Sequence, residues 1–311
     1  MAHWAKAFAL ILLISCCGAS ARAFHNPDSS ANTHLRVRMI AGYLMVVSVS
    51  VNDRGPFDFV VDTGTNTTLI DPQLATELGL QPKDTLKLAS LASATDVPRY
   101  YFQTFRVGPA SVSNQEALAV PLPQLTALDR KIRGVLGMNF LLQFSFRLDY
   151  EHHTLELYPL PESAKVPSGL RVPVEINESR MLIKVMSEAS PSGSWKLVLD
   201  SGIAQFLIFQ DRITAPSERS CGKASCLMQV ATNLAAHRAS TILLHDVSLA
   251  GVQLPEIPAV VMRNDLQKPS DLQDGLLPTA PFRSVFFDRT NATVIFSPVP
   301  GPFTIAAFRQ P

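Results

Sequence analysis

One motif occurs twice in this 311-residue chain, and this duplication constrains the fold more than any other feature. In both copies a run of apolar residues leads into an Asp, a hydroxyl residue and a Gly. The two copies end in Asp62-Thr63-Gly64 and in Asp200-Ser201-Gly202. Apolar, β-favouring runs that end in Asp and Gly turn signals indicate strands joined in hairpins. Each copy therefore predicts a hairpin whose second strand ends at an Asp-hydroxyl-Gly turn.

The repeat continues downstream of both turns. At almost the same spacing each copy has a short apolar segment, Gly134-Val135-Leu136-Gly137 in the first and Gly275-Leu276-Leu277-Pro278 in the second. A further hairpin follows in each copy, over residues 148–159 and 287–298. Such a repeat indicates two copies of one β-rich unit. We predict an N-terminal lobe over residues 24–160 and a C-terminal lobe over residues 161–311.

Helices are expected to be few and short. The strongest signal lies at residues 71–79, where Asp71 can cap the helix, Pro72 stands at its first position and Gly79 ends it. A single helical turn is also predicted at residues 139–144. The fold class that follows is all-β, in two β-barrel-like lobes with a few short helices.

The composition agrees with two packed lobes and excludes several classes of function. Hydrophobic residues make up 47% of the chain and charged residues 17%, so a disordered chain is excluded. The 27 Lys and Arg nearly balance the 26 Asp and Glu, which gives no general attraction to nucleic acid. The seven His form no metal-binding signature, and the Gly-x-Ser-x-Gly string typical of many serine hydrolases is absent.

The beginning of the chain is typical of an export signal over residues 1–23. Lys6 is followed by an uncharged apolar run, and Ala21 and Ala23 provide small residues at a cleavage site. The run is shorter than the roughly 20 residues that span a bilayer, so no transmembrane span is expected. The alternative is a bacterial lipobox ending at Cys16, which would become a lipidated N-terminus. Both interpretations predict an exported protein, either periplasmic or secreted or anchored to a bacterial membrane by lipid.

Export also bears on the two cysteines that lie beyond the signal, Cys221 and Cys226. In an oxidising compartment, cysteines so close in sequence are expected to close a short loop by a disulfide bond. A metal site is the alternative, for which only His237 lies nearby.

An Asp-hydroxyl-Gly turn by itself is often only a turn, because Asp accepts local N–H bonds and Gly adopts backbone angles that other residues avoid. The duplication changes this interpretation. An approximate twofold axis between the copies would bring Asp62 and Asp200 together between the lobes. Two carboxyl groups at close range share one proton, so their titrations separate. The ionised group can then activate water while the protonated group binds a carbonyl oxygen, which is general acid–base hydrolysis of an amide.

The segments Val61-Asp62-Thr63-Gly64-Thr65, Leu199-Asp200-Ser201-Gly202 and Val135-Leu136-Gly137 resemble the motifs of the aspartic proteases, specifically the bacterial retropepsin-like group. The resemblance extends over residues 34–298. It implies a bilobal acid-protease fold in which a monomer acts as an internal pseudo-dimer. It also implies an extended peptide or protein substrate, bound between the lobes as an added strand. No metal or organic cofactor is expected, because the nucleophile is water.

The resemblance further implies roles for the residues around the two Asp. The hydroxyls of Thr63 and Ser201 would cross-link the two turns beneath the carboxyl groups. Gly64, Thr65 and Gly202 would complete the support of the dyad. The apolar segments would pack against the Asp turns through Val135, Leu136, Gly137, Leu276 and Leu277.

Several positions depart from the family pattern. Ile203 stands where the first copy has Thr65, and Pro278 stands where it has Gly137. The Gly-rich hairpin tip expected of a retropepsin flap is missing, so residues 86–101 and 228–243 are flap candidates by position alone.

The difference between Thr65 and Ile203 predicts a division of roles. A hydrogen bond from Thr65 would lower the pKa of Asp62, and Ile203 offers Asp200 nothing equivalent. Asp62 is then the base and Asp200 carries the proton.

The sequence therefore predicts an aspartic endopeptidase with catalytic residues Asp62 and Asp200. Two alternatives remain open at this stage. One is a degenerate, non-catalytic member of the fold that binds extended peptides, which the departures at Ile203 and Pro278 favour. The other is a structural envelope protein in which both Asp turns are only turns.

Overall fold

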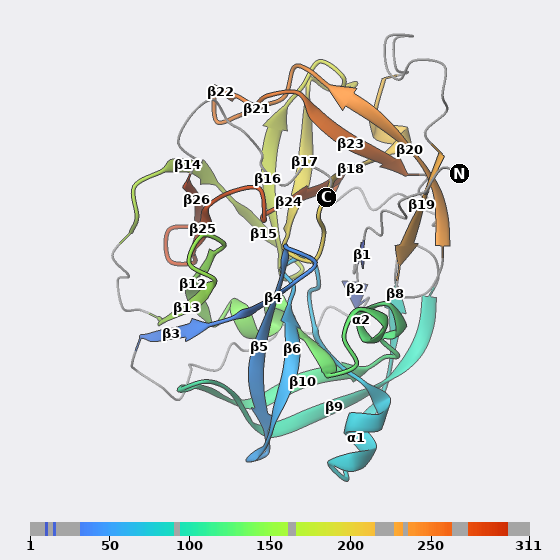
Figure 1. The fold of residues 1–311 in the computed structure, drawn as a ribbon, viewed down its shortest axis with the longest axis vertical. Coiled ribbons are helices and arrows are strands. Elements are labelled where there is room, and N and C mark those ends of the chain that lie inside the picture. The colour runs from blue at the N-terminus through green and yellow to red at the C-terminus, as the bar shows by residue number, and fades with distance from the viewer. Residues whose placement is uncertain are drawn as a thin grey trace, which may run out of the picture.

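The computed structural model describes residues 10–11, 15–16, 32–89, 94–160, 166–214, 227–232, 236–262 and 273–297. The predicted disulfide between Cys221 and Cys226 lies outside these ranges, as does nearly all of the predicted export signal. Most described residues belong to three β-sheets (Figure 1).

The first sheet is built from nine strands of the N-terminal half. In spatial order they are β2 (Ser15–Cys16), β8 (Asp84–Ala89), β9 (Ala94–Val107), β10 (Ala110–Ala119), β7 (Thr68–Ile70), β11 (Ile132–Leu136), β6 (Arg54–Val61), β5 (Leu44–Val51) and β4 (Arg38–Ile40). Strand β11 pairs parallel with β6 and antiparallel with β7. The apolar segment at 134–137 thus lies between the strands that flank the first Asp turn.

The second sheet has eleven strands, ten of which lie along one path. In order these are β1 (Leu10–Ile11), β19 (Leu227–Thr232), β20 (Ala236–Leu244), β23 (Ile257–Met262), β18 (Phe206–Phe209), β24 (Gly275–Pro278), β17 (Ser194–Asp200), β16 (Arg180–Met186), β21 (Ser248–Leu249) and β22 (Val252–Gln253), and β15 (Glu175–Asn177) pairs with β16. Strand β24 pairs parallel with β17 and antiparallel with β18. The second half therefore repeats the pairing scheme of the first.

The third sheet joins the two halves. Its six strands run in the order β14 (Leu170–Pro173), β26 (Thr293–Ser297), β25 (Ser284–Asp288), β12 (Phe144–Asp149), β13 (Thr154–Pro159) and β3 (Thr33–Arg36). At its centre β12 pairs antiparallel with β25, and the rings of Phe146 and Phe287 stack with centroids 4.3 Å apart. Each half contributes three strands, and the lobe boundary at residue 160 stays a prediction.

The helices are short, as the sequence predicts. Helix α1 (Pro72–Glu77) begins after Asp71, whose side chain accepts a hydrogen bond of 2.7 Å from the Gln73 N–H. Helix α3 (Met138–Leu141) overlaps the helical turn predicted at residues 139–144, but it begins one residue earlier and ends three residues earlier. Helix α2 (Pro123–Leu128) and the 3₁₀ turn η1 (Gln210–Arg212) were not predicted, although a proline within the first turn is a helix-start signal that α2 carries.

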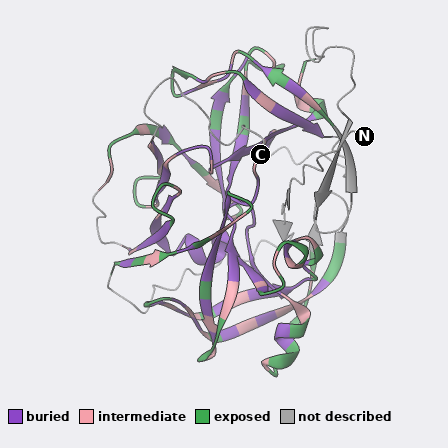
Figure 2. Cartoon of the chain, viewed as in Figure 1, coloured by how far each residue is buried: buried purple, intermediate pink, exposed green. Residues whose placement is uncertain are grey.

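Each of the two Asp turns follows a buried stretch of strand. Burial increases along β6 until Phe59, Val60 and Val61 are wholly inaccessible, and β17 ends in a buried run in the same way (Figure 2). Full burial of one such aliphatic side chain contributes about 1.5–3 kcal/mol. Each turn is thus anchored to a buried part of its sheet. Within the described ranges, no helix combines the length and apolar character needed to cross a membrane.

Candidate active site

The pairing of the sheets places the two Asp residues at equivalent points. Asp62 follows β6 directly, and its N–H donates to the carbonyl of Leu136 at 3.0 Å. Asp200 ends β17, and its carbonyl accepts a hydrogen bond of 3.2 Å from the Thr279 N–H. Both Asp side chains are fully buried.

Four reciprocal hydrogen bonds hold the turns against each other. The Thr63 hydroxyl donates to the Leu199 carbonyl at 2.8 Å and accepts from the Ser201 N–H at 3.0 Å. The Ser201 hydroxyl donates to the Val61 carbonyl at 2.9 Å and accepts from the Thr63 N–H at 3.0 Å. Each hydroxyl therefore bonds to the other turn and to the strand before it.

The glycines allow the two carboxyl groups to meet. The Gly64 N–H donates to Asp62 Oδ1 at 2.8 Å, and the Gly202 N–H donates to Asp200 Oδ1 at 2.7 Å. A Cβ atom on Gly64 would overlap Asp200 Oδ2, and one on Gly202 would lie 2.9 Å from the carboxyl carbon of Asp62. The two carboxyl groups lie close enough to share a hydrogen bond when one of them carries a proton.

The surroundings of the two carboxyl groups differ. The Thr65 hydroxyl donates to Asp62 Oδ2 at 2.8 Å. On the other side Ile203 is buried in an apolar cluster with Leu182 and Leu207 and has no polar side-chain atom to offer. Among the described residues, no donor lies against Asp200 Oδ2.

These differences separate the two titrations. Burial raises the pKa of Asp62 to about 6, and the hydrogen bonds from Thr65 and Gly64 oppose that rise. Burial, followed by the negative charge of Asp62, raises the pKa of Asp200 well above its usual range. Asp62 accepts a hydrogen bond from a side-chain hydroxyl, which favours its ionised form, whereas the charge of Asp62 disfavours ionisation of Asp200.

The apolar segments lie beside the turns in both lobes. Val135, Leu136, Leu276 and Leu277 are all buried. Gly137 packs so tightly that a Cβ atom would lie 2.5 Å from the carbonyl carbon of Thr67.

Pro278 fits into the ladder at the corresponding place, where it pairs with Asp200. The N–H that Pro278 lacks is not needed, because the residue at the position of Thr68 has no side-chain acceptor for it. The Gly137 N–H bonds to the Thr68 hydroxyl at 3.4 Å, whereas Phe206 holds the position of Thr68 in the second lobe and offers no acceptor.

Sequence reasoning missed two polar residues near the site, Asn139 and Tyr150. Asn139 Oδ1 accepts hydrogen bonds from the Thr68 N–H and the Thr68 hydroxyl, both at 2.8 Å. The Tyr150 hydroxyl shares a hydrogen bond of 2.6 Å with Thr279 Oγ1. A polar residue inside the apolar run of α3 was the available signal for Asn139, and no local pattern identifies Tyr150.

The two flap candidates fall on hairpins, β8–β9 and β19–β20. Whether they cover a bound substrate stays a prediction. Within the part of the chain that the structure describes, no three His, Cys, Asp or Glu side chains gather in a way that could hold a metal ion.

Comparison with known proteins places these features in a family context. Residues 47–140 match the family described as aspartyl protease. No curated protein sequence matches. A retropepsin-like aspartic protease from Rickettsia conorii is 20% identical over 42% of this chain and 95% of its own, with a TM-score of 0.32.

Two further structures extend over most of the chain. An aspartic proteinase from Irpex lacteus is 12% identical, covers 89% of this chain and 99% of its own, and has a TM-score of 0.51. Basic 7S globulin from soybean is 12% identical over 86% of this chain and 95% of its own, with a TM-score of 0.48. The predicted bilobal all-β fold is thereby confirmed. The chain has the fold of an aspartic proteinase over both halves and matches the aspartyl protease family in its first, which confirms its resemblance to the aspartic proteases.

Proposed function

We propose that this protein is an aspartic endopeptidase in which Asp62 and Asp200 activate a water molecule to attack a peptide bond. The observation that carries the proposal is the set of reciprocal bonds between Thr63 and Ser201, which holds together the turns of two buried carboxyl groups, each beside the glycine of the other turn. The aspartyl protease match and fold support the same chemistry.

The proposed mechanism assigns different work to the two acids. Ionised Asp62 takes a proton from the attacking water, and the proton on Asp200 moves to the carbonyl oxygen of the scissile bond. The tetrahedral intermediate then collapses: Asp62 gives the proton it took from water to the leaving nitrogen, the C–N bond breaks, and a hydroxyl proton of the intermediate returns to Asp200. The separated titrations suit this division, because one group must be ionised while its neighbour is protonated.

The substrate is proposed to be an extended peptide or an unfolded protein segment. An extended chain can satisfy its backbone groups by pairing with a sheet edge, which is a general mode of peptide recognition. The protein is proposed to act as a monomer, since both Asp turns come from one chain.

A peptide library incubated with the protein between about pH 4 and 7 tests the proposal, with Asp62→Asn and Asp200→Asn as matched variants. Cleavage by the wild type that both variants lose, and that a pepstatin-type inhibitor blocks, supports the peptidase. Binding of peptides without cleavage would favour the non-catalytic alternative. Neither binding nor cleavage would leave the Asp turns as structural elements.

Export and processing are proposed separately. Mature protein that begins near residue 24 would support the signal peptide, and a lipidated Cys16 at the N-terminus would support the lipobox. Intact mass of the purified protein distinguishes the two outcomes.

A further inference from the structure

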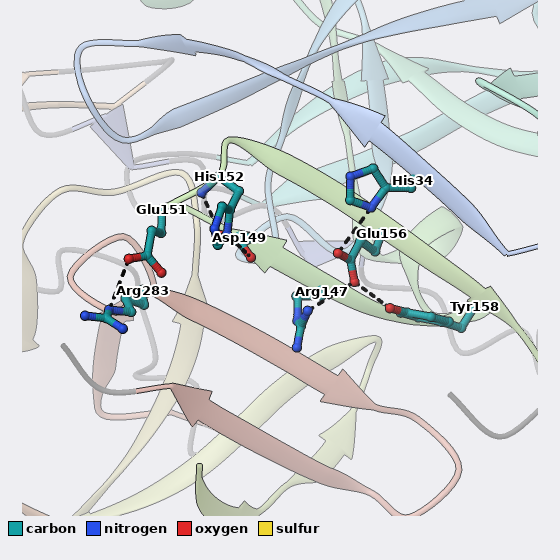
Figure 3. A network of polar contacts seen from close by, with 8 residues as sticks. All are labelled: His34, Arg147, Asp149, Glu151, His152, Glu156, Tyr158 and Arg283. Carbon is teal, nitrogen blue, oxygen red and sulfur yellow. Dashed lines mark hydrogen bonds and ion pairs between the residues drawn. The ribbon is translucent and has the colours of Figure 1, made fainter. Parts of the chain in front are cut away.

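The turn at residues 150–153, between β12 and β13, belongs to the first half of the chain and contacts the second half. The N–H groups of Tyr150 and Glu151 both donate to the Arg283 carbonyl, at 2.8 and 3.2 Å. The Glu151 carboxylate also forms an ion pair of 3.5 Å with the Arg283 guanidinium, as Figure 3 shows. Asp149 Oδ1 fixes the turn from within by accepting the His152 N–H at 2.8 Å. The turn is therefore held against the loop that follows β24.

The Tyr150 side chain contacts the start of that loop, next to β24. Its hydroxyl shares the hydrogen bond of 2.6 Å with Thr279 Oγ1, and Thr279 is completely buried. The Thr279 N–H in turn donates to the Asp200 carbonyl at 3.2 Å. A chain of two hydrogen bonds thus connects the phenol to the backbone of Asp200.

The phenol also lies within the electric field of the dyad. Burial raises the pKa of Tyr150 above its ordinary value, and the negative charges of Asp200 and Asp62 raise it further. The Thr279 hydroxyl opposes this rise.

The first lobe supports its equivalent loop differently. There Asn139 binds both polar groups of Thr68, and the Asn139 amide donates to the Glu116 carbonyl at 2.8 Å. In the second lobe Ala280 stands in the place of Asn139 and Phe206 in the place of Thr68. The second lobe therefore lacks both side chains of this network at the matching positions, and its neighbouring residue Thr279 bonds to Tyr150 instead.

The corresponding turn of the second lobe contacts the first lobe at other residues. Its residue Arg289 bonds to the Ser145 hydroxyl through its N–H at 3.1 Å and to the Leu142 carbonyl through Nε at 3.2 Å. Both partners lie beyond α3, whereas Thr279 directly follows Pro278, which pairs with Asp200.

We propose that Tyr150 is a positioning residue for Asp200, acting through Thr279 across the lobe interface. It fixes the loop after β24, whose Thr279 N–H bonds to the Asp200 carbonyl, without touching the carboxyl group, so the apolar surroundings of that group are preserved. The inference rests on the proposed function, since it assigns Tyr150 to the same dyad.

The test compares Tyr150→Phe with Tyr158→Phe. The Tyr158 hydroxyl donates to Glu156 at 2.5 Å in the same sheet (Figure 3), so its removal deletes a phenol hydroxyl away from the dyad. We expect Tyr150→Phe to lower kcat about tenfold with less than about a twofold change in KM, because the dyad is misaligned while the binding surface is kept. Tyr158→Phe should leave kcat unchanged.

A second readout does not depend on activity. Titration of ¹³C-labelled Asp carboxyl groups by NMR should show Asp200 losing its proton at lower pH in Tyr150→Phe, since a loosened loop admits water and relieves burial. Thr279→Val should reproduce the shift, and Thr279→Ser should retain the wild-type titration. An unchanged Asp200 titration in Tyr150→Phe, or an equal shift in Tyr158→Phe, would overturn the proposal. If the wild type cleaves no peptide, the proposed function fails, and the titration still decides the role of Tyr150.

Discussion

The hydrogen bond from Thr65 to Asp62 makes the sharpest prediction about pH. Thr65→Val keeps the branched shape of the side chain and removes the hydroxyl that donates to Asp62 Oδ2 at 2.8 Å. Because this bond favours the ionised form, its loss raises the pKa of Asp62. Asp62 then ionises at higher pH, and the acidic limb of the pH–rate profile moves to higher pH.

The size of the shift follows from the strength of such bonds. A hydrogen bond to a charged group contributes about 1.5–3 kcal/mol. One pKa unit corresponds to about 1.4 kcal/mol, so the loss of this bond raises the pKa of Asp62 by about one to two units. The Gly64 N–H still donates to Asp62 Oδ1, which keeps the carboxyl group in place.

The measurement is kcat/KM for a quenched fluorogenic peptide at intervals between about pH 3 and 8, since this profile reports the ionisations of the free enzyme. The Tyr158→Phe variant serves as the control, because its deleted hydroxyl bonds to Glu156 away from the dyad. An acidic limb that stays in place, or that moves to lower pH, would show that Thr65 does not control the ionisation of Asp62.

Three further outcomes are expected. Ile203→Thr places a hydroxyl beside Asp200, so the pKa of Asp200 falls and the basic limb of the same profile moves to lower pH. Gly64→Ala forces a Cβ atom into Asp200 Oδ2, and kcat should fall by about a hundredfold while circular dichroism shows a folded protein. Asp200→Asn should be more stable than the wild type in urea at about pH 7 and lose this advantage near pH 3. Folding raises the pKa of the Asp200 carboxyl, so the wild type has the full contribution of this group to stability below its unfolded pKa and loses it as the pH rises toward the folded pKa.

The sequence predicted those features of the fold that depend only on residues close together in the chain. The Asp turns, the hairpins that begin near residues 148 and 287, and helix α1 all depend on neighbouring residues. The duplication then predicted that Asp62 and Asp200 would meet, because two copies of one unit pack about an approximate twofold axis.

Features that depend on contacts between distant segments were not predictable in this way. Strands β3 and β14 lie at the two edges of the third sheet, and which strand takes each place is decided by packing between the halves. The same is true of Tyr150, whose partner Thr279 is far away in the sequence. A tyrosine in a turn carries no local signal of the residue that it will contact.

Two positions near the Asp turns carry a polar side chain in the first copy and an apolar one in the second. Thr65 and Asn139 give the first lobe hydrogen-bonding side chains, and Ile203 and Ala280 replace them in the second. A residue that must hold a proton gains from this loss, since any donor to its carboxylate would lower its pKa and bring the two titrations together. The second loop still needs to be held in place, and a bond to Thr279 from the opposite lobe can do this without approaching the Asp200 carboxyl group. In the proposed mechanism, Asp200 thus lacks, among the described residues, the side-chain donor that would favour its ionisation and keeps a contact that fixes its backbone, which would let a duplicated unit supply two acids with different roles.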